Sequence, residues 1–472
     1  MSTSSSPTSG NLKHASTQAK SDQIRRTGRR GWTPPPRLSL PQWADRYRRL
    51  AKVAGSMSGP WSTAAVEVAR GPMFAVTEPG MHVITTMVST QLLKTSFIEN
   101  VFGYFAHLDP CRILLLQPKD DAAVQFSKER ITPLVRATPV LRERVGTSRM
   151  HTADETLLFK SFRGGFLALA GAGSPDNLAH RPIRIVLADE IDKYPVTHEG
   201  DPITLAEERV ATFANWLAVR TRSPTVQEES RIEASYHESD QWRVSVEYPH
   251  CGHRQFLDFF LHVEWDKRKN AAGNVVEYRP RTARAYCEAC GAGWSEGERL
   301  NALQTARWHQ TRPFECCCAR HVPLDDYERA WRGTDDASDN EDALATVWDW
   351  WASDRHAVYR AKCPVCGAWG IDNIHAGFHT SKLYSPRQRD RPADVASKWL
   401  AAQGDEDRLQ AWWNTQMGMP YRPHTGRGLH IEALAARGEV WAAPVEDGVA
   451  VLVVGADVQR TYGVELETGL GA

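Results

Sequence analysis

The chain has 472 residues, 42% hydrophobic and 24% charged, a composition typical of globular cores in about three domains. Its 57 Lys and Arg balance 57 Asp and Glu, so the net charge gives no indication of a nucleic-acid partner. No apolar run approaches the roughly 18 residues that span a bilayer, and no apolar leader follows Met1, so we expect neither a membrane protein nor a secreted one.

Residues 1–40 are rich in Ser, Thr, Gly and Pro and predict a disordered basic tail, either a solvated leader or an arm that contacts DNA or another subunit. From Trp43 onward, apolar strands alternate with amphipathic helices, which indicates parallel strand pairing in an α/β layer fold. The predicted helices are Gln42–Val53, Thr95–Ala106, Asp121–Ala137 and Ile203–Ala214, and the predicted strands are Met81–Val88, Arg112–Leu116, Phe166–Ala170, Arg184–Ala188 and Trp216–Thr221.

The alternation stops after about Val244, and the next segment holds most of the cysteines. Further on, Pro392–Gln403 and Arg408–Met417 are predicted helices, and Val449–Val454 is a predicted buried strand.

One hydrophobic strand, Ile185–Ala188, is followed directly by Asp189 and Glu190. This is the Walker B arrangement, in which the Asp holds Mg²⁺ and the Glu polarises the water that attacks a γ-phosphate. Many buried strands end in acidic residues, so the pattern is weak when it stands alone.

A second segment, 89–96, follows a predicted strand and opens a predicted helix, which is the context of a phosphate-binding P-loop. Lys94 would reach the β- and γ-phosphates of ATP, and Thr95 would place its hydroxyl on Mg²⁺. The usual glycines are missing, so the segment alone is equally compatible with an ordinary helix N-terminus. The order of Lys-Thr, then Asp-Glu, is that of a P-loop ATPase.

The cysteines suggest metal ligands, because paired thiols without an export signal favour metal over disulfides. Cys287 and Cys290 form one C-x-x-C pair and Cys363 and Cys366 another. Their candidate partners are Cys251 with His253 or His250 for the first pair, and Cys318 with His321, or Cys316 or Cys317 in place of that His, for the second. Such sets fit structural Zn²⁺.

Taken together, these motifs resemble the large terminase subunit of lambda-like tailed phages. The stretches that carry the resemblance are W-A-D-R-Y-R-R-L (43–50), Q-x-x-K-T (91–95), G-G-F-L-A-L-A-G-A-G-S-P (164–175), L-A-D-E-I-D-K-Y-P (187–195), S-P-T (223–225), S-R-I-E (230–233), P-H-C-G-H (249–253), G-F-H (377–379), L-Y-S-P (383–386) and G-A-D-V-Q (455–459).

The resemblance implies an ATPase that drives double-stranded DNA into procapsids and an RNase H-like nuclease after it. It implies ATP and Mg²⁺ as ligands, Gln91 in the ATP site, Ser223 in the segment that couples ATP state to movement, and Asp457 as a nuclease metal ligand. The sequence ends soon after Asp457, so we expect a truncated nuclease that does not cut DNA, because such a site needs several carboxylates.

The resemblance also implies domains: a P-loop ATPase at 41–245, a zinc-ribbon-like insertion at 246–375, a helical linker or lid at 376–446 and the start of the nuclease at 447–472. The implied partners are the terminase small subunit, the portal protein and further copies of the chain, in the host cytoplasm. Two alternatives remain open: a non-catalytic remnant that binds DNA or a partner through its zinc module, and a helicase-like enzyme, which would require a second motor domain after Val244.

Leu93 and Arg222 depart from the family pattern, which has Gly before the lysine and a small hydroxyl residue before Ser223. If the loop requires a positive φ at Leu93, the strain costs about 1–3 kcal/mol, and Leu93→Gly should tighten ATP binding. If the loop has relaxed, Leu93 points into the core at little cost. We expect a weakened but working site.

Overall fold

The computed structural model describes residues 36–51, 58–146, 157–173, 182–198, 200–210, 212–271, 274–312, 314–316, 319–321, 358–359, 374–423, 451–459 and 463–471. By its internal contacts the chain divides into two units, residues 1–422 and residues 423–472.

The first unit is built on an 11-stranded sheet with the order β16-β13-β9-β17-β3-β8-β7-β4-β6-β5, in which β10 pairs with β9. Strands β9, β17, β3, β8, β7, β4 and β6 run parallel to one another, whereas β5, β10 and β13 are antiparallel to their neighbours. The strands are β3 (Val83–Val88), β4 (Arg112–Gln117), β5 (Phe159–Phe162), β6 (Gly165–Gly171), β7 (Ile185–Asp189), β8 (Leu217–Arg222), β9 (Trp242–Glu247), β10 (Arg254–Phe256), β13 (Arg307–Gln310), β16 (Val358–Tyr359) and β17 (His375–Thr380).

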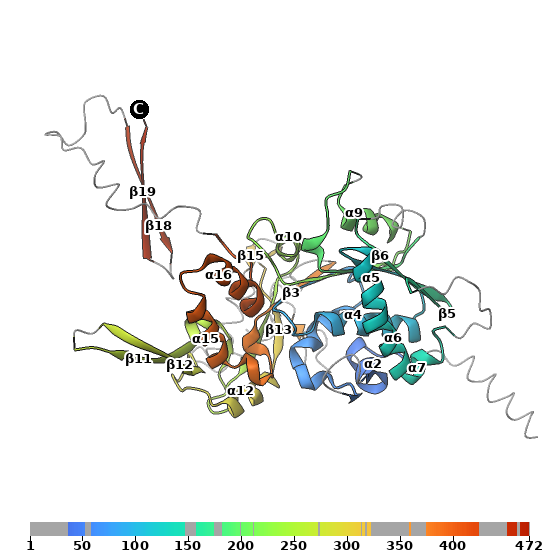
Figure 1. The fold of residues 1–472 in the computed structure, drawn as a ribbon, viewed down its shortest axis with the longest axis horizontal. Helices are drawn as coiled ribbons and strands as arrows, with labels where there is room; N and C mark the ends of the chain where they lie inside the picture. Colours follow the sequence, from blue (N-terminus) through green and yellow to red (C-terminus); the bar gives the residue numbers. More distant parts are fainter. Residues whose placement is uncertain are drawn as a thin grey trace, which may run out of the picture. The chain divides into compact units, whose positions relative to one another are not determined.

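Helices cover both faces of this sheet, as the α/β pattern predicts (Figure 1). Along β4 and β7, alternate side chains enter two separate cores. Ile113 and Leu187 join the core that contains α4 (Lys94–His107), and Leu114 and Val186 join the core that contains α9 and α10. The helices that flank the sheet are α2 (Leu40–Tyr47), α3 (Arg70–Ala75), α4, α5 (Asp120–Phe126), α6 (Thr132–Ala137), α7 (Pro139–Arg142), α9 (Pro202–Glu207) and α10 (Arg231–Glu238).

The five strands predicted before residue 245 and the helix at 95–106 are confirmed within two or three residues. Three other helices differ from their predicted spans. The helix predicted at 121–137 is α5, a π-helical turn at Ser127–Ile131 and α6 in succession. The one predicted at 203–214 ends earlier, as α9 and a short 3-10 turn at Glu208–Val210.

The helix predicted at 42–53 is shorter because α2 ends before Arg48. Arg48 takes an extended conformation, and its guanidinium reaches inward to the side chains of Glu99 and Asn100 on α4. A buried guanidinium without partners would be strongly destabilising, so these contacts of Arg48 outweigh the tendency of the next residues to continue the helix.

After β9 the chain forms a small module within the predicted insertion at 246–375 and then returns to the sheet. The sequence did not predict this return. The module contains α11 (Phe259–His262), the two-stranded ribbon β11 (Val263–Lys269) and β12 (Val275–Ala285), and α12 (Glu296–Leu303). The predicted linker at 376–446 begins with β17, which lies between β3 and β9 in the main sheet. Residues up to 422 therefore form one unit, with no domain boundary at residue 245.

Two helices follow β17 and pack together beside the sheet: α15 (Pro392–Ala402) and α16 (Glu406–Trp412), with a π-helical turn, η7 (Trp413–Met417), after them. Both were predicted. Of the second unit, the structure describes β18 (Val451–Gln459) and β19 (Gly463–Gly471), which pair antiparallel with Asp457 opposite Glu465. No helix among the described residues is both long enough and apolar enough to cross a membrane.

Candidate functional site

The loop between β3 and α4 lies where a P-loop would, at the carboxyl end of a central parallel strand. Two segments distant in sequence hold it. The Ser89 amide donates to the carbonyl of Thr380 at the end of β17 (3.1 Å), and the Thr90 amide and hydroxyl both approach the carbonyl of Thr415 in η7 at 3.3 Å. The loop is therefore fixed by elements some 300 residues later, and helix α4 begins directly after it with Lys94.

Lys94 extends from the first turn of α4 across the ends of the parallel strands. Its ammonium donates to the Ser223 hydroxyl (2.8 Å), which donates to the carbonyl of Val88 (2.7 Å). Burial lowers the pKa of Lys94, and the nearby carboxylates of Asp189 and Glu190 oppose that shift. The sequence-predicted lysine, coupling serine and acidic pair thus meet at one edge of the sheet.

Asp189 ends β7 and is 7% exposed. Its two carboxylate oxygens accept hydrogen bonds from the Thr221 hydroxyl (2.7 Å) and the Gln117 amide (3.3 Å). Burial raises the pKa of Asp189, and these two hydrogen bonds oppose the rise. Thr221 and Gln117 come from the ends of the two strands that flank β7, so neighbouring strands orient this carboxylate.

Glu190 takes a left-handed backbone conformation, with φ 58° and ψ 43°. A non-glycine residue in this region costs on the order of 1–3 kcal/mol, and such strain concentrates at functional sites. Its carboxylate pairs with Lys193, and an Arg222 nitrogen lies 3.8 Å away. Burial alone would raise the pKa of Glu190, but Lys193, Arg222 and Lys94 together lower it, so the carboxylate stays ionised.

Asp192, which the motif analysis did not single out, connects the loop after β7 to the segment after β8. Its Oδ2 accepts from the hydroxyls of Thr225 (3.1 Å) and Ser230 (2.7 Å), and its Oδ1 accepts from the amide of Ile232 (2.9 Å). Arg222 lies 3.7 Å from the same side chain. The only sequence signal for Asp192 is its place two residues after the acidic pair, because its partners lie more than 30 residues away.

The remaining predicted ATP-site residues, Thr95 and Gln91, lie at the start of α4 and in the loop before it. Thr95 is half-buried in the first helical turn. Gln91 is exposed, and its side-chain oxygen lies 3.5 Å from a guanidinium nitrogen of Arg387. Gln117 and Thr221 were missed by the sequence analysis, although polar residues at the carboxyl ends of buried strands were the available signal.

Leu93 is not strained, contrary to the expectation drawn from the missing glycine. Its φ is −148°, its side chain is 6% exposed, and it belongs to the main hydrophobic core. The positive φ of the loop falls instead on Gln91, at 55°. The relaxed-loop alternative therefore describes this structure, and the expected gain in nucleotide affinity from Leu93→Gly has no physical basis.

The loop also fits a bound phosphate in a way that does not depend on the motif. The Ser89 hydroxyl is buried and has no hydrogen-bond partner among the described residues. It stands at the end of β3, just before the helix whose first amides have no intrahelical acceptors. Unpaired buried donors next to a helix N-terminus and a buried lysine suit phosphate oxygens.

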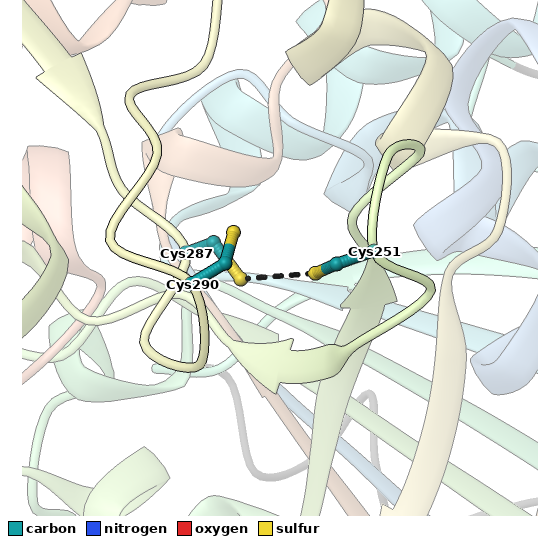
Figure 2. A group of neighbouring side chains, drawn as sticks. All are labelled: Cys251, Cys287 and Cys290. Atoms are coloured by element: carbon teal, nitrogen blue, oxygen red, sulfur yellow. Dashed lines mark hydrogen bonds between the residues drawn. The ribbon is translucent and has the colours of Figure 1, made fainter.

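Three cysteines meet away from this edge, in the module after β9 (Figure 2). Cys251 lies on the loop between β9 and β10, and Cys287 and Cys290 lie on the loop after β12. Their sulfur atoms all lie within 4.8 Å of one another, and those of Cys251 and Cys287 are 3.5 Å apart. Tetrahedral Zn²⁺ with bonds of about 2.3 Å places sulfur atoms about 3.8 Å apart, so the donor set fits this metal.

The predicted fourth ligand, His253, is not part of this group. Its Nε2 is paired with Glu288 at 2.8 Å, which holds the ring outside the sulfur cluster. His250 is paired with Glu298 in a similar way. Tyr248 is buried and stacks on Trp294 with ring centroids 5.1 Å apart. The second predicted set, Cys318, Cys363 and Cys366, lies outside the described residues.

The sheet order and the edge at which these side chains meet define a P-loop-like α/β fold. The family model of the phage terminase large subunit gpA ATPase domain matches residues 55–308, and that of the gpA endonuclease domain matches residues 375–468. The chain therefore belongs to the phage terminase large subunit family of the gpA type. The ATPase match crosses residue 245, in agreement with the continuous sheet.

Two curated relatives are similar over most of this chain. The large terminase subunit of Enterobacteria phage P21 is 24% identical over 433 residues, which is 90% of this chain and 59% of that protein. The large terminase subunit of Escherichia phage lambda is 23% identical over 439 residues, or 92% of this chain and 60% of that protein. The chain thus spans about three fifths of the length of these relatives.

Among solved structures, the large terminase of bacteriophage HK97 aligns with a TM-score of 0.33 and 13% identity, over 42% of this chain and 40% of that one. The large terminase ATPase domain of Thermus phage P74-26 aligns with a TM-score of 0.27 and 14% identity, over 38% of this chain and 73% of that one.

We predict that Leu93→Gly destabilises the protein and does not tighten nucleotide binding. The change removes a buried leucine side chain, and such losses cost about 2–5 kcal/mol. Denaturant unfolding would measure the loss of stability, and nucleotide titration would measure affinity.

The matched control is Gln91→Gly in the same loop. Glycine adopts a positive φ without the steric penalty, so we expect equal or slightly higher stability, by up to about 1 kcal/mol. A Leu93→Gly variant that keeps its stability and binds ATP several-fold more tightly would show that the loop conformation differs from the one described.

Proposed function

We propose that this chain hydrolyses ATP to drive viral double-stranded DNA into procapsids, as a large terminase subunit. The observation that carries the proposal is the meeting of four side chains from the ends of β7 and β8 and from α4: Lys94, Asp189, Glu190 and Ser223. A partly buried ammonium near a buried Asp and an ionised, conformationally strained Glu is suited to phosphoryl transfer to water.

In this assignment each residue has a distinct role. Lys94 binds the β- and γ-phosphates, and Gln91 lines the same loop. Asp189 and Thr95 hold Mg²⁺, which would neutralise charge on the phosphate oxygens. Glu190 accepts a proton from the attacking water, and its ionised state suits it to that role.

The proposal also assigns the coupling of hydrolysis to movement. Lys94 donates a hydrogen bond to Ser223. A movement of Lys94 when the phosphates are hydrolysed would therefore act directly on the segment after β8. Asp192 connects that segment to the loop that carries Glu190. Rearrangement of Lys94 or Glu190 on hydrolysis would therefore displace residues 223–232 as a group.

The partners and the domain arrangement are proposed from the family. Double-stranded DNA, the small terminase subunit, the portal protein and further copies of the chain are the expected partners. We propose residues 41–245 with their returning strands as the motor and 246–375 as the cysteine-rich module. Residues 376–422 complete the sheet and support the P-loop. The endonuclease family match begins at 375, and we propose 447–472 as the start of the nuclease itself. Asp457 on β18 is the candidate nuclease metal ligand.

The non-catalytic remnant was favoured by Leu93 and Arg222. Leu93 no longer supports it, because its backbone is unstrained and its side chain is part of the core. Arg222 packs beside Glu190 and Asp192 with ion-pair distances of 3.8 and 3.7 Å, so the substitution adds a cation that both acidic groups accommodate. The geometry therefore favours a working site.

We predict that Glu190→Gln retains ATP binding and lowers the rate of hydrolysis by about 10²–10⁴-fold, because an amide does not take a proton from water. The measurement is ATP turnover with duplex DNA present, alongside nucleotide titration. The control is Glu208→Gln, an exposed carboxylate on the turn after α9, which should turn over at the parent rate. Hydrolysis by Glu190→Gln at the parent rate would refute its assignment, and no hydrolysis by the parent would favour the remnant.

We further propose that Cys251, Cys287 and Cys290 bind one structural Zn²⁺. The support is the donor set itself: three thiols from two loops, with sulfur atoms at distances that suit one tetrahedral ion. The ion would tie the loop after β9 to the loop after β12. Cys287 stands two residues after β12 and Cys251 in the turn after β9, so the metal would stabilise the join between these two segments.

Elemental analysis of protein purified without chelators tests this proposal. We predict that Cys290→Ser, at an exposed thiol of the cluster, lowers the zinc content by one ion per chain relative to the parent. Cys111→Ala, at a buried cysteine outside the cluster, should leave the content unchanged. Equal zinc in the parent and Cys290→Ser, or none in the parent, would contradict the site.

A further inference from the structure

The ribbon formed by β11 and β12 extends away from α12 and α15 and is exposed for most of its length (Figure 1). Only its base is buried, at Val263, Ala283 and Ala285. Beyond that base most of its side chains are exposed, and Val276 and Tyr278 are 52% and 51% exposed. An isolated two-stranded ribbon is marginally stable in water, so a long and largely exposed one suits contact with a partner.

The charge of the ribbon is strongly biased, in a chain whose net charge is zero. Its described residues carry six basic side chains and three acidic ones, which gives a net charge of +3. Six basic residues are exposed along both strands, and they are Lys267, Arg268, Lys269, Arg279, Arg281 and Arg284.

The acidic residues neutralise only part of this set. Glu277 pairs with both Arg268 (3.1 Å) and Arg279 (3.4 Å), and Arg281 pairs with Asp394 on α15 (3.2 Å). Lys267 lies over the ring of Trp265, at 5.6 Å from its centroid. Within the described residues, neither Lys267 nor Lys269 forms an ion pair. Cations therefore remain available for an anionic partner near the far end of β11.

The base of the ribbon is firmly held, so a force on the ribbon would be passed to the motor domain. The backbone amide of Trp294 donates to the carbonyl of Ala285 (2.7 Å), and the backbone amide of Tyr286 donates to the carbonyl of His262 (2.8 Å). Cys287 of the thiol cluster follows β12 after one intervening residue. Helix α15 packs along β12, and the same helical segment leads to the turn that supports the P-loop.

The dimensions of the ribbon fit the major groove of duplex DNA. Seven residues of β11 span about 23 Å at roughly 3.3 Å per residue. The major groove of B-form DNA is about 12 Å wide and admits a two-stranded ribbon. Exposed Lys and Arg side chains along both edges would then face the phosphates, which is the contact that gives binding without sequence preference.

We propose that the β11–β12 ribbon is a DNA-contacting arm that engages the phosphate backbone of duplex DNA through the basic residues of its two strands. This rests on the proposed function insofar as duplex DNA is the substrate of the motor, but the arm binds DNA whether or not ATP is hydrolysed. The contact depends on charge, so its strength falls with salt in proportion to the number of phosphates neutralised.

The test compares the parent with the double variant Lys267→Gln, Lys269→Gln, using the full chain and a 30-base-pair fluorescent duplex without nucleotide. Anisotropy titrations over a range of salt concentrations give the slope of log K against log salt. Each phosphate contact contributes about 0.9 to that slope, so we expect its magnitude to fall by about 1.8. Basal ATP hydrolysis and the thermal unfolding midpoint should match the parent, because both residues lie outside the motor core and the hydrolysis site.

The matched control is Lys128→Gln, Arg136→Gln, which removes the same charge from exposed positions beside α5 and α6. It should keep the parent slope. If the salt slope is unchanged in the ribbon variant, or changes equally in the control, the proposal that the ribbon binds DNA is wrong. So would loss of self-association in sedimentation with unchanged DNA binding, which would place a second copy on the ribbon. If the parent binds DNA with the expected salt slope but does not hydrolyse ATP, the proposed motor function is wrong and the DNA-contacting role of the ribbon is unaffected.

Discussion

The arrangement of this protein depends on one constraint: a lysine ammonium is held, largely out of water, at the carboxyl edge of a parallel sheet. Burial lowers the pKa of Lys94, and the site remains tolerable because Ser223 accepts a hydrogen bond and Asp189 and Glu190 lie nearby. These partners come from the ends of separate strands, so the parallel order of β3, β8 and β7 is what brings them together. Each then acquires a supporting contact, such as the hydrogen bonds from Thr221 and Gln117 to Asp189.

The position of Lys94 also depends on strand β17, with which the chain returns to the sheet after the cysteine-rich module. The loop before Lys94 lacks the glycines of a usual P-loop, and its shape is fixed from outside by carbonyl groups of Thr380 and Thr415. A loop that places Gln91 at positive φ needs such external support, because a strained backbone conformation persists only when surrounding contacts hold it. Strand β17 and turn η7 therefore support the proposed nucleotide site, although they lie some 300 residues further along the chain. The thiol cluster and the ribbon are joined to this frame through α15 and β12.

Local patterns were sufficient to predict the parallel core and the acidic pair. Buried strands such as β4 and β7 are continuous apolar runs, and Asp189 and Glu190 stand at the end of one of them. What the sequence did not predict depends on long-range contacts. Arg48 ends α2 early because of Glu99 on another helix, and β17 enters the sheet from beyond the insertion. Asp192 has only a weak sequence signal, its place after the acidic pair, because its partners Thr225, Ser230 and Ile232 are set by the fold. The missing glycine suggested strain at Leu93, but the strain lies at Gln91 and Glu190, where the loop geometry requires positive φ.

The most direct test of the central assignment is equilibrium binding of a fluorescent ATP analogue to the parent and to Lys94→Ala, with and without Mg²⁺. A hydrogen bond to a charged group contributes about 1.5–3 kcal/mol, so the account predicts a loss of affinity of roughly tenfold to 150-fold in the variant. Lys128→Ala, at an exposed lysine away from the sheet edge, should bind as the parent does. Equal affinity of the parent and Lys94→Ala, with the variant folded, would contradict the nucleotide site described here.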